Sequence, residues 1–126
     1  MGGNPIAWFE IYVQDMVRAR AFYEAVFQRP LTALGNHGTG PFQMWAFEGD
    51  VTSYGAPGAL VMMKGMPSGG NSTLVYFHCA DCAVEESRVE AAGGKVFRPK
   101  MAIGEHGFVS LVLDPDGNMI GLHSMP

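Results

Sequence analysis

The sequence predicts an α+β fold in which two tandem βαβββ modules form a mixed-sheet cup, and two observations support this. First, the chain contains an internal repeat, in which residues 13–15 (Val-Gln-Asp) match residues 79–81 (Cys-Ala-Asp) 66 positions later. Second, both segments follow alternating apolar residues and precede an apolar helix, so the order of elements repeats as well. A repeat of this size indicates two similar modules related by a pseudo-two-fold axis. Extended along the chain, the same shift matches Phe42 with Phe108 and Trp45 with Leu111.

The first module, residues 5–64, is predicted to begin with a strand at residues 6–13 that has one apolar face. Asp15 is a suitable N-cap for the helix that follows, and Pro30 ends that helix. Three shorter strands are then predicted at residues 31–34, 42–47 and 58–63.

A segment rich in Gly, Ser and Pro, residues 65–71, is predicted to link the modules. The second module, residues 72–125, repeats the pattern with a strand at residues 73–79 and a helix that begins after Asp81 and ends at Gly93. Three further strands are predicted at residues 95–98, 108–113 and 118–123, with a tight Asp-Pro-Asp-Gly turn between the last two. Each helix can cover one face of its sheet, which leaves the opposite faces either to form a shared concave surface or to be exposed.

Length and composition favour a single domain that spans residues 1–126. The chain has 126 residues, of which 48% are hydrophobic, and two modules of this size need a shared core. The net charge of −4 and the absence of a basic cluster argue against nucleic acid as a partner. The apolar runs have the length of strands, which argues against a membrane span. Two cysteines and no export signal favour a cytoplasmic protein.

Four segments in a fixed order link the chain to a known family: Val13-x-Asp15, Arg18-Ala19-x-x-Phe22-Tyr23, Glu90-Ala91-Ala92-Gly93-Gly94 and Asp114-Pro115-Asp116-Gly117-Asn118. This order, together with the repeat, resembles the vicinal oxygen chelate superfamily of glyoxalase I, extradiol dioxygenases and bleomycin-resistance proteins. The resemblance covers nearly the whole chain. It implies the glyoxalase/bleomycin-resistance fold, a small-molecule ligand in the cup, and a homodimer.

In metal-binding members of that superfamily, the first and last strands of each module supply the metal ligands. The resemblance carries these positions onto Trp8, Val61, Leu74 and Gly121. None of these side chains has the carboxylate, imidazole or thiolate donor that a divalent cation needs. We therefore expect a divergent member with no metal or other cofactor, in which the Trp8 indole faces Gly121 across a pocket for an organic ligand.

Polar side chains with the same strand parity are expected to lie along the cup: Glu10, Tyr12, Tyr76, His78 and His123. Three alternatives stay open for them, namely hydrogen-bonded wall residues, ligand contacts, or a catalytic or displaced metal site. Glu10, His78 and His123 are the catalytic candidates, because a carboxylate and imidazoles can exchange protons near neutral pH.

Three other features have simpler interpretations. The C-x-x-C pair, Cys79 and Cys82, is interpreted as two ordinary thiols, since the repeat matches Cys79 with the core residue Val13. Several methionines, Met101 among them, are interpreted as core filling or as part of a soft pocket. The loop at residues 104–107 is expected to lie at the mouth of the cup or to form a solvated turn.

The leading hypothesis is a protein that binds a small apolar or aromatic molecule in the cup without metal. The alternatives are a metal-dependent lyase, isomerase or dioxygenase with a displaced metal, and a metal-free enzyme in which Glu10 or a histidine moves a proton. The residues predicted to contact the ligand are Trp8, Glu10, Tyr12, Val61, Leu74, Tyr76, His78, Phe108, Gly121 and His123.

Overall fold

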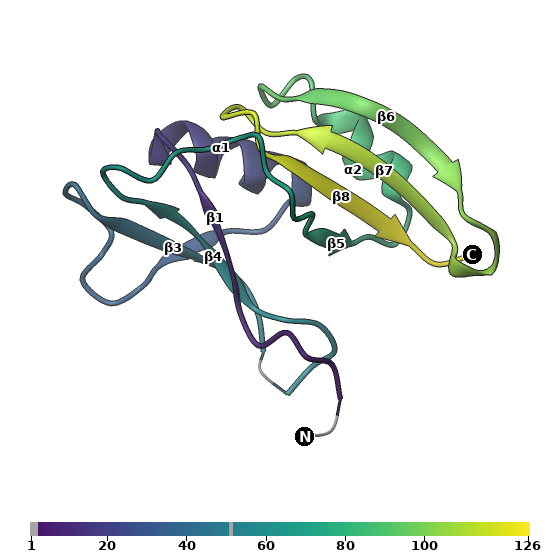
Figure 1. The fold of residues 1–126 in the computed structure, drawn as a ribbon, viewed down its shortest axis with the longest axis horizontal. Coiled ribbons are helices and arrows are strands. Elements are labelled where there is room, and N and C mark those ends of the chain that lie inside the picture. Colours follow the sequence, from purple (N-terminus) through teal and green to yellow (C-terminus); the bar gives the residue numbers. More distant parts are fainter. Residues whose placement is uncertain (1–2, 51) are drawn as a thin grey trace.

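The computed structural model describes residues 3–50 and 52–126 and confirms the α+β fold with two βαβββ modules (Figure 1). The strands of the first module form a four-stranded sheet in the order β1-β4-β3-β2: β1 (Phe9–Tyr12), β2 (Leu31–Ala33), β3 (Gln43–Phe47) and β4 (Gly58–Met62). The second sheet has the equivalent order β5-β8-β7-β6: β5 (Tyr76–His78), β6 (Lys95–Ala102), β7 (Phe108–Leu113) and β8 (Met119–Ser124). In each sheet, the first strand of the module runs parallel to the last, and the other pairs are antiparallel.

Each module has one helix, α1 (Met16–Phe27) or α2 (Cys82–Arg88). Asp15 and Asp81 are the N-caps, as predicted, and each carboxylate accepts a hydrogen bond from a backbone N–H of the first turn. Helix α2 is shorter than predicted, because residues 89–93 form turns instead of continuing the helix. Gly93 adopts a φ of 102°, which a side chain would disfavour at this reversal of the chain.

The two modules share one core on the helix side of the sheets. Figure 1 shows two separate sheets that splay apart, with both helices behind them in this view. Helix α2 packs on β6, β7 and β8, and α1 packs on β4 and on α2. The rings of Phe27 from the first module and Phe77 from the second stack with their centroids 4.4 Å apart. Buried residues from both modules complete the core, among them Phe22, Tyr23, Val26, Val112 and Leu122.

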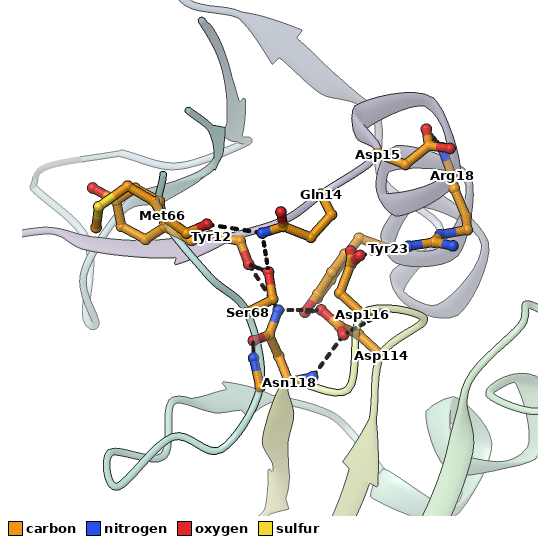
Figure 2. A network of polar contacts seen from close by, with 11 residues as sticks. Tyr12, Gln14, Asp15, Arg18, Tyr23, Met66, Ser68, Asp114, Asp116 and Asn118 are labelled. Atoms are coloured by element: carbon orange, nitrogen blue, oxygen red, sulfur yellow. Dashed lines mark hydrogen bonds and ion pairs between the residues drawn. The ribbon is translucent and has the colours of Figure 1, made fainter. Parts of the chain in front are cut away.

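Polar contacts join the modules where β1 ends near the turn between β7 and β8 (Figure 2). The buried carboxylate of Asp114 accepts hydrogen bonds from the Tyr23 hydroxyl and from the Asn118 side chain, each at 2.9 Å. The Asn118 amide also donates to the carbonyl oxygen of Tyr12 at 3.0 Å. Ser68, in the segment between the modules, donates to the same carbonyl. The N–H of Gly69, in the same segment, donates to the Asn118 side chain at 2.7 Å, so the segment is held against both modules.

The backbone hydrogen bonds correct how the repeat extends to the last strands. The N–H of Val13 donates to the carbonyl of Val61 at 2.9 Å, and the N–H of Cys79 donates to the carbonyl of His123 at 2.8 Å. Since Val13 and Cys79 are repeat partners, Val61 corresponds to His123. The predicted match of Val61 with Gly121 is therefore wrong by two residues.

The third and seventh strands also differ from the predicted match. Met44 of β3 and Val109 of β7 occupy equivalent places, opposite Val61 and His123 respectively. The predicted match of Trp45 with Leu111 is therefore wrong by one residue. A shift of one residue turns every side chain of a strand to the other face of its sheet. This shift decides which residues of β7 face the site.

Strand lengths differ from the prediction as well. Strands β1 and β5 are shorter than expected, so Trp8 and Leu74 precede them in the chain. Strand β6 is longer and contains Pro99, which is tolerated because β6 is an edge strand with register shifts on both sides of Arg98. In the part of the chain that the structure describes, no helix has the length and apolar character needed to cross a membrane.

Candidate ligand-binding site

The face of each sheet that points away from the helices carries most of the predicted site residues, and we call it the outer face. Residues paired across neighbouring strands point to the same face of a sheet. On the first sheet, Glu10 and Tyr12 lie on the outer face, while Ile11 between them packs in the core. On the second sheet, two rows of paired residues lie on it: Tyr76, Gly121 and Leu111, and His78, His123 and Val109.

A pocket of about 450 Å³ opens on the outer face of the second sheet. Four strands and the segment before the short helix η1 (Gly104–His106) line it, through Tyr76, Arg98, Met101, Ile103, Val109, Leu111 and His123. The walls are mainly apolar, and polar groups come from one tyrosine, one arginine and one histidine. This volume and this mixture of groups are typical of sites for small organic ligands.

The ring of Tyr76 covers Gly121 on the outer face. A Cβ atom at Gly121 would clash with this ring, so the packing requires glycine. The two residues are paired across β5 and β8, which explains the contact. The sequence predicted that Trp8 faces Gly121. The structure instead places the Tyr76 ring over this glycine, and Tyr76 thereby forms a wall of the pocket.

His123 is held at the pocket by the backbone of η1. Its Nε2 atom lies 2.7 Å from the carbonyl oxygen of His106. A carbonyl oxygen only accepts hydrogen bonds, so Nε2 carries a proton and Nδ1 of the neutral ring is left as an acceptor. The His78 ring lies beside it, with the centroids 6.2 Å apart. The structure thus brings the two catalytic candidates of the second module together, with His123 in the pocket wall.

A second polar group lies along β1, where the Glu10 carboxylate joins two aromatic side chains. It accepts a hydrogen bond from the indole N–H of Trp8 at 3.2 Å and from the hydroxyl of Tyr12 at 2.8 Å. These bonds orient both aromatic side chains along the first sheet. All residues that line the outer-face pocket belong to the second module. The predicted site residues therefore form two separate sets, one along β1 and one at the pocket.

The Tyr12 phenol offers a direct test of this arrangement. Its hydrogen bond to Glu10 raises the pKa of Tyr12 above 10.0, since the neighbouring carboxylate disfavours the phenolate. Because the folded pKa is raised, the contribution of this contact to stability is complete below the unfolded pKa and is lost as pH rises through the folded pKa. We expect Glu10→Gln to return the pKa of Tyr12 toward 10.0 in an ultraviolet titration. The Tyr12→Phe variant identifies which part of the absorbance change comes from Tyr12. An unchanged Tyr12 titration in Glu10→Gln would contradict the hydrogen bond between the two side chains.

Of the predicted contact residues, Tyr76 and His123 are among the lining residues of the pocket, and besides the β1 group three others lie away from it. Val61 is buried, with 1% of its surface exposed. Phe108 packs on the helix side of its sheet against the core, and the Lys100 ammonium lies 4.5 Å from its ring centroid. The one-residue shift along β7 explains this correction, because Val109 and not Phe108 points to the outer face. Leu74 precedes β5 and is partly exposed.

The sequence did not identify four wall residues, which are Arg98, Ile103, Val109 and Leu111. The last two alternate along β7, so the correct register would have revealed them. The first two depend on the length of β6 and on its register shifts at Arg98, for which the sequence has no clear signal. Met101, one of the methionines expected in the core or in a soft pocket, lies in the wall.

The chain has no metal-binding side chains at the positions that hold the metal ligands in the superfamily it resembles. With the corrected register the residues at these positions are Trp8, Ala59, Leu74 and Gly121, and none has a donor side chain. Within residues 3–50 and 52–126, no three or more His, Cys, Asp or Glu side chains are grouped to hold a metal. A metal at a displaced position stays a prediction that elemental analysis tests.

Cys79 and Cys82 are free thiols, and Cys82 is buried. Burial raises the pKa of Cys79 to about 12, and the nearby Glu85 carboxylate adds to the rise. The thiolate is the reactive form, so we expect iodoacetamide at pH 8 to alkylate Cys79 at least ~10-fold more slowly in the folded than in the unfolded protein. Mass spectrometry of the peptide that contains Cys79 measures this ratio. Equal rates in the two states would show that the thiol is not shielded.

Comparison with known proteins gives a consistent result. Residues 5–122 match the family described as "Glyoxalase/Bleomycin resistance protein/Dioxygenase superfamily". A protein of Mycobacterium bovis named "Putative glyoxylase CFP32" is 28% identical over 120 residues, which cover 91% of this chain and 43% of the relative. The chain therefore spans less than half the length of that curated relative.

Solved structures also resemble the chain. TnmS3, an antibiotic binding protein from Streptomyces sp. CB03234, is 25% identical with a TM-score of 0.69, and the match covers 100% of this chain and 99% of that chain. A glyoxalase-related enzyme from Fulvimarina pelagi has a TM-score of 0.73 at 19% identity, over 96% of this chain and 88% of that chain. The second likeness concerns the fold alone.

Proposed function

Because the chain belongs to the glyoxalase/bleomycin resistance protein/dioxygenase superfamily, we propose that it binds a small apolar or aromatic molecule, without metal, on the outer face of its second sheet. The observation that supports this most is the largely apolar pocket of about 450 Å³ beside His123. Apolar walls with a few polar groups favour an aromatic ligand held in one orientation. The antibiotic-binding role in the name of TnmS3, which matches the whole chain at 25% identity, supports the same class of function.

Arg98 gives the ligand a preferred charge. Its side chain lines the pocket, and no carboxylate in the described part of the chain forms an ion pair with it. A guanidinium at the edge of an apolar pocket binds a carboxylate through paired hydrogen bonds. The ligand that best fits the pocket is therefore an aromatic compound with an anionic group, whose ring packs beside Tyr76 and Leu111.

Calorimetric titration with a series of aromatic carboxylates tests this proposal. We expect Arg98→Gln to weaken the binding of the best ligand by about tenfold, which corresponds to ~1.4 kcal/mol. The control is Arg29→Gln, since Arg29 is exposed and lies 3.9 Å from Glu48, outside this pocket. The proposal fails if no carboxylate in the series binds, or if Arg98→Gln and Arg29→Gln have equal affinity for it.

The second candidate function is a metal-dependent lyase, isomerase or dioxygenase with a displaced metal, and the proximity of His78 and His123 favours it. Imidazoles are common ligands for Zn, Ni and Fe. Elemental analysis of protein purified without chelator separates the two functions. We expect less than one metal ion per chain, and the same content in a His78→Ala/His123→Ala variant. A stoichiometric metal that is lost in that variant would overturn the metal-free proposal.

We also infer that the protein forms a homodimer. Strands β1 and β5 are edge strands, and the aromatic side chains of Trp8 and Tyr76 near them are 40% and 49% exposed. Exposed edges with apolar side chains favour pairing with another chain. Light scattering after size-exclusion chromatography should therefore give twice the chain mass of 13.6 kDa. A single-chain mass at micromolar concentration would exclude the dimer.

A further inference from the structure

A second cavity, of about 750 Å³, lies between the modules around the edge strand β5, and both Phe77 on the core side and Tyr76 and His78 on the outer face of that strand line it. We propose that this cavity binds an organic cation, in which an amine or quaternary ammonium group is attached to an aromatic or apolar body. Tyr76 lines both this cavity and the outer-face pocket, but the floor of this cavity is formed by phenylalanine rings that pack on the core side of the sheets. The cavity also differs from that pocket in the charge of its polar groups.

The floor of the cavity is aromatic. The Phe77 ring of β5 lines it, and its centroid lies 4.4 Å from that of the Phe27 ring and 5.4 Å from that of the Phe47 ring. The Phe9 ring meets it edge-on at 5.9 Å. These rings come from α1, β1, β3 and β5, so both modules are needed to build the floor. Aromatic rings bury apolar groups well, and their faces attract cations.

Glu85 of α2 provides the negative group. It lines the cavity, and its Oε1 atom is buried without a hydrogen-bond partner among the described residues. A buried polar atom that makes no hydrogen bond costs free energy, and more so when it belongs to an ionised group. The nearest group is the Cys79 thiol, which stays protonated because its pKa is raised to about 12, so it can offer Glu85 only a weak neutral donor and no positive charge. An ammonium group of a ligand would supply a charged partner.

The rim of the cavity has an excess of carboxylates. Glu48 and Asp50 line it together with Glu85, whereas Arg29 is the one Lys or Arg among its lining residues in the described part of the chain. Arg29 already lies 3.9 Å from Glu48. The charge of the site is thus complementary to a cation, which is the opposite of the preference set by Arg98 in the outer-face pocket.

Tyr54 provides an exposed aromatic wall of the cavity. Its side chain comes from the connection between β3 and β4, is 79% exposed, and lies with its ring 5.2 Å from that of His78. An exposed tyrosine beside an aromatic floor can cover one side of a bound cation, and ring faces around an ammonium group are a recurrent way to recognise it. The exposed position also makes Tyr54 replaceable without loss of the core.

Two probes of opposite charge test the inference, benzyltrimethylammonium and phenylacetate, with binding followed by chemical-shift changes of the backbone amides. We expect the cation to shift residues around Phe77 and Glu85. Glu85→Gln should weaken its binding by about tenfold, since the substitution removes the charge and keeps the shape. Tyr54→Ala should weaken it as well. The matched control is Glu90→Gln, because Glu90 is an exposed glutamate just after α2 that does not line the cavity.

Three results would overturn the inference: no shifts at millimolar benzyltrimethylammonium, equal affinity in Glu85→Gln and Glu90→Gln, or equal binding of phenylacetate at the same residues. Thermal unfolding of each variant checks that the fold is retained. Arg98→Gln should leave the binding of the cation unchanged, so failure of the outer-face proposal and failure of this one are distinguished in the same series.

Discussion

Replacement of Asp114 by alanine is expected to lower the free energy of unfolding by about 3–5 kcal/mol, the largest effect of a single side chain that we predict. The Asp114 carboxylate accepts hydrogen bonds at 2.9 Å from the Tyr23 hydroxyl, the Asn118 side chain, and the backbone N–H groups of Asp116 and Asn118. Tyr23 is only 1% exposed, so its hydroxyl cannot turn to water. Each buried donor left without an acceptor costs about 1–3 kcal/mol.

Urea unfolding of the variant and of wild type measures this loss. The control is Glu105→Ala, because the Glu105 side chain is 89% exposed and should contribute little. A loss below about 1 kcal/mol for Asp114→Ala would mean that the contacts shown in Figure 2 do not join the modules in solution.

The pH dependence of the stability difference between wild type and Asp114→Ala is a further check. Burial outweighs the hydrogen bonds and raises the pKa of Asp114 above 3.8. The folded state therefore holds this proton more tightly than the unfolded state. The stability that this tighter proton binding contributes is fully present below the unfolded pKa of Asp114 and is lost as pH rises through its raised folded pKa. The difference between wild type and Asp114→Ala should consequently widen on acidification through that range.

Gly121→Ala is expected to cost about 1–3 kcal/mol in stability and to weaken aromatic carboxylate binding, because the new methyl group must displace the Tyr76 ring. That ring is a wall of the outer-face pocket and packs directly on Gly121. The glycine lies in the middle of β8, where its neighbours Ile120 and Leu122 are buried, so the strand cannot move away. The ring has to move instead.

A double-mutant cycle separates this clash from the lower flexibility of alanine in the unfolded chain. In a Tyr76→Ala background, Gly121→Ala should cost less, with a coupling free energy of about 1 kcal/mol or more. Thermal unfolding measures the four stabilities, and calorimetry with the best carboxylate measures the effect on the pocket. Equal costs in the two backgrounds would show that the ring and the glycine do not pack together.

The features that sequence reasoning identified correctly depend on local periodicity. Alternation along the first strand of each module assigned Glu10 and Tyr12, and likewise Tyr76 and His78, to one face of their sheets. The capping residues before both helices were also identified, because an Asp that precedes an apolar helical repeat has few other uses. None of these inferences requires knowledge of which strand lies next to which.

The errors arose where one strand had to be aligned with another. A constant shift of 66 residues does not account for the different lengths of the connections in the two modules. The matches of Val61 with Gly121 and of Trp45 with Leu111 are therefore both out of register, and Phe108 was expected in the wall instead of Val109. The register of a strand pair is set by backbone hydrogen bonds and turns, and a single residue of error reverses the side chains.

By itself, the sequence determined the two-module fold, the helix caps and the face of most polar site residues, because these follow from spacing within one element. Only the tertiary structure decided which side chains meet. It placed Tyr76 over Gly121, brought Arg98 to the pocket through the irregular β6, and separated the Trp8–Glu10–Tyr12 group from that pocket. The inter-module cavity with Glu85 also arises only when the modules pack. The physical reason is that a pocket is a property of register, bulges and module packing, which residues distant in the sequence fix together.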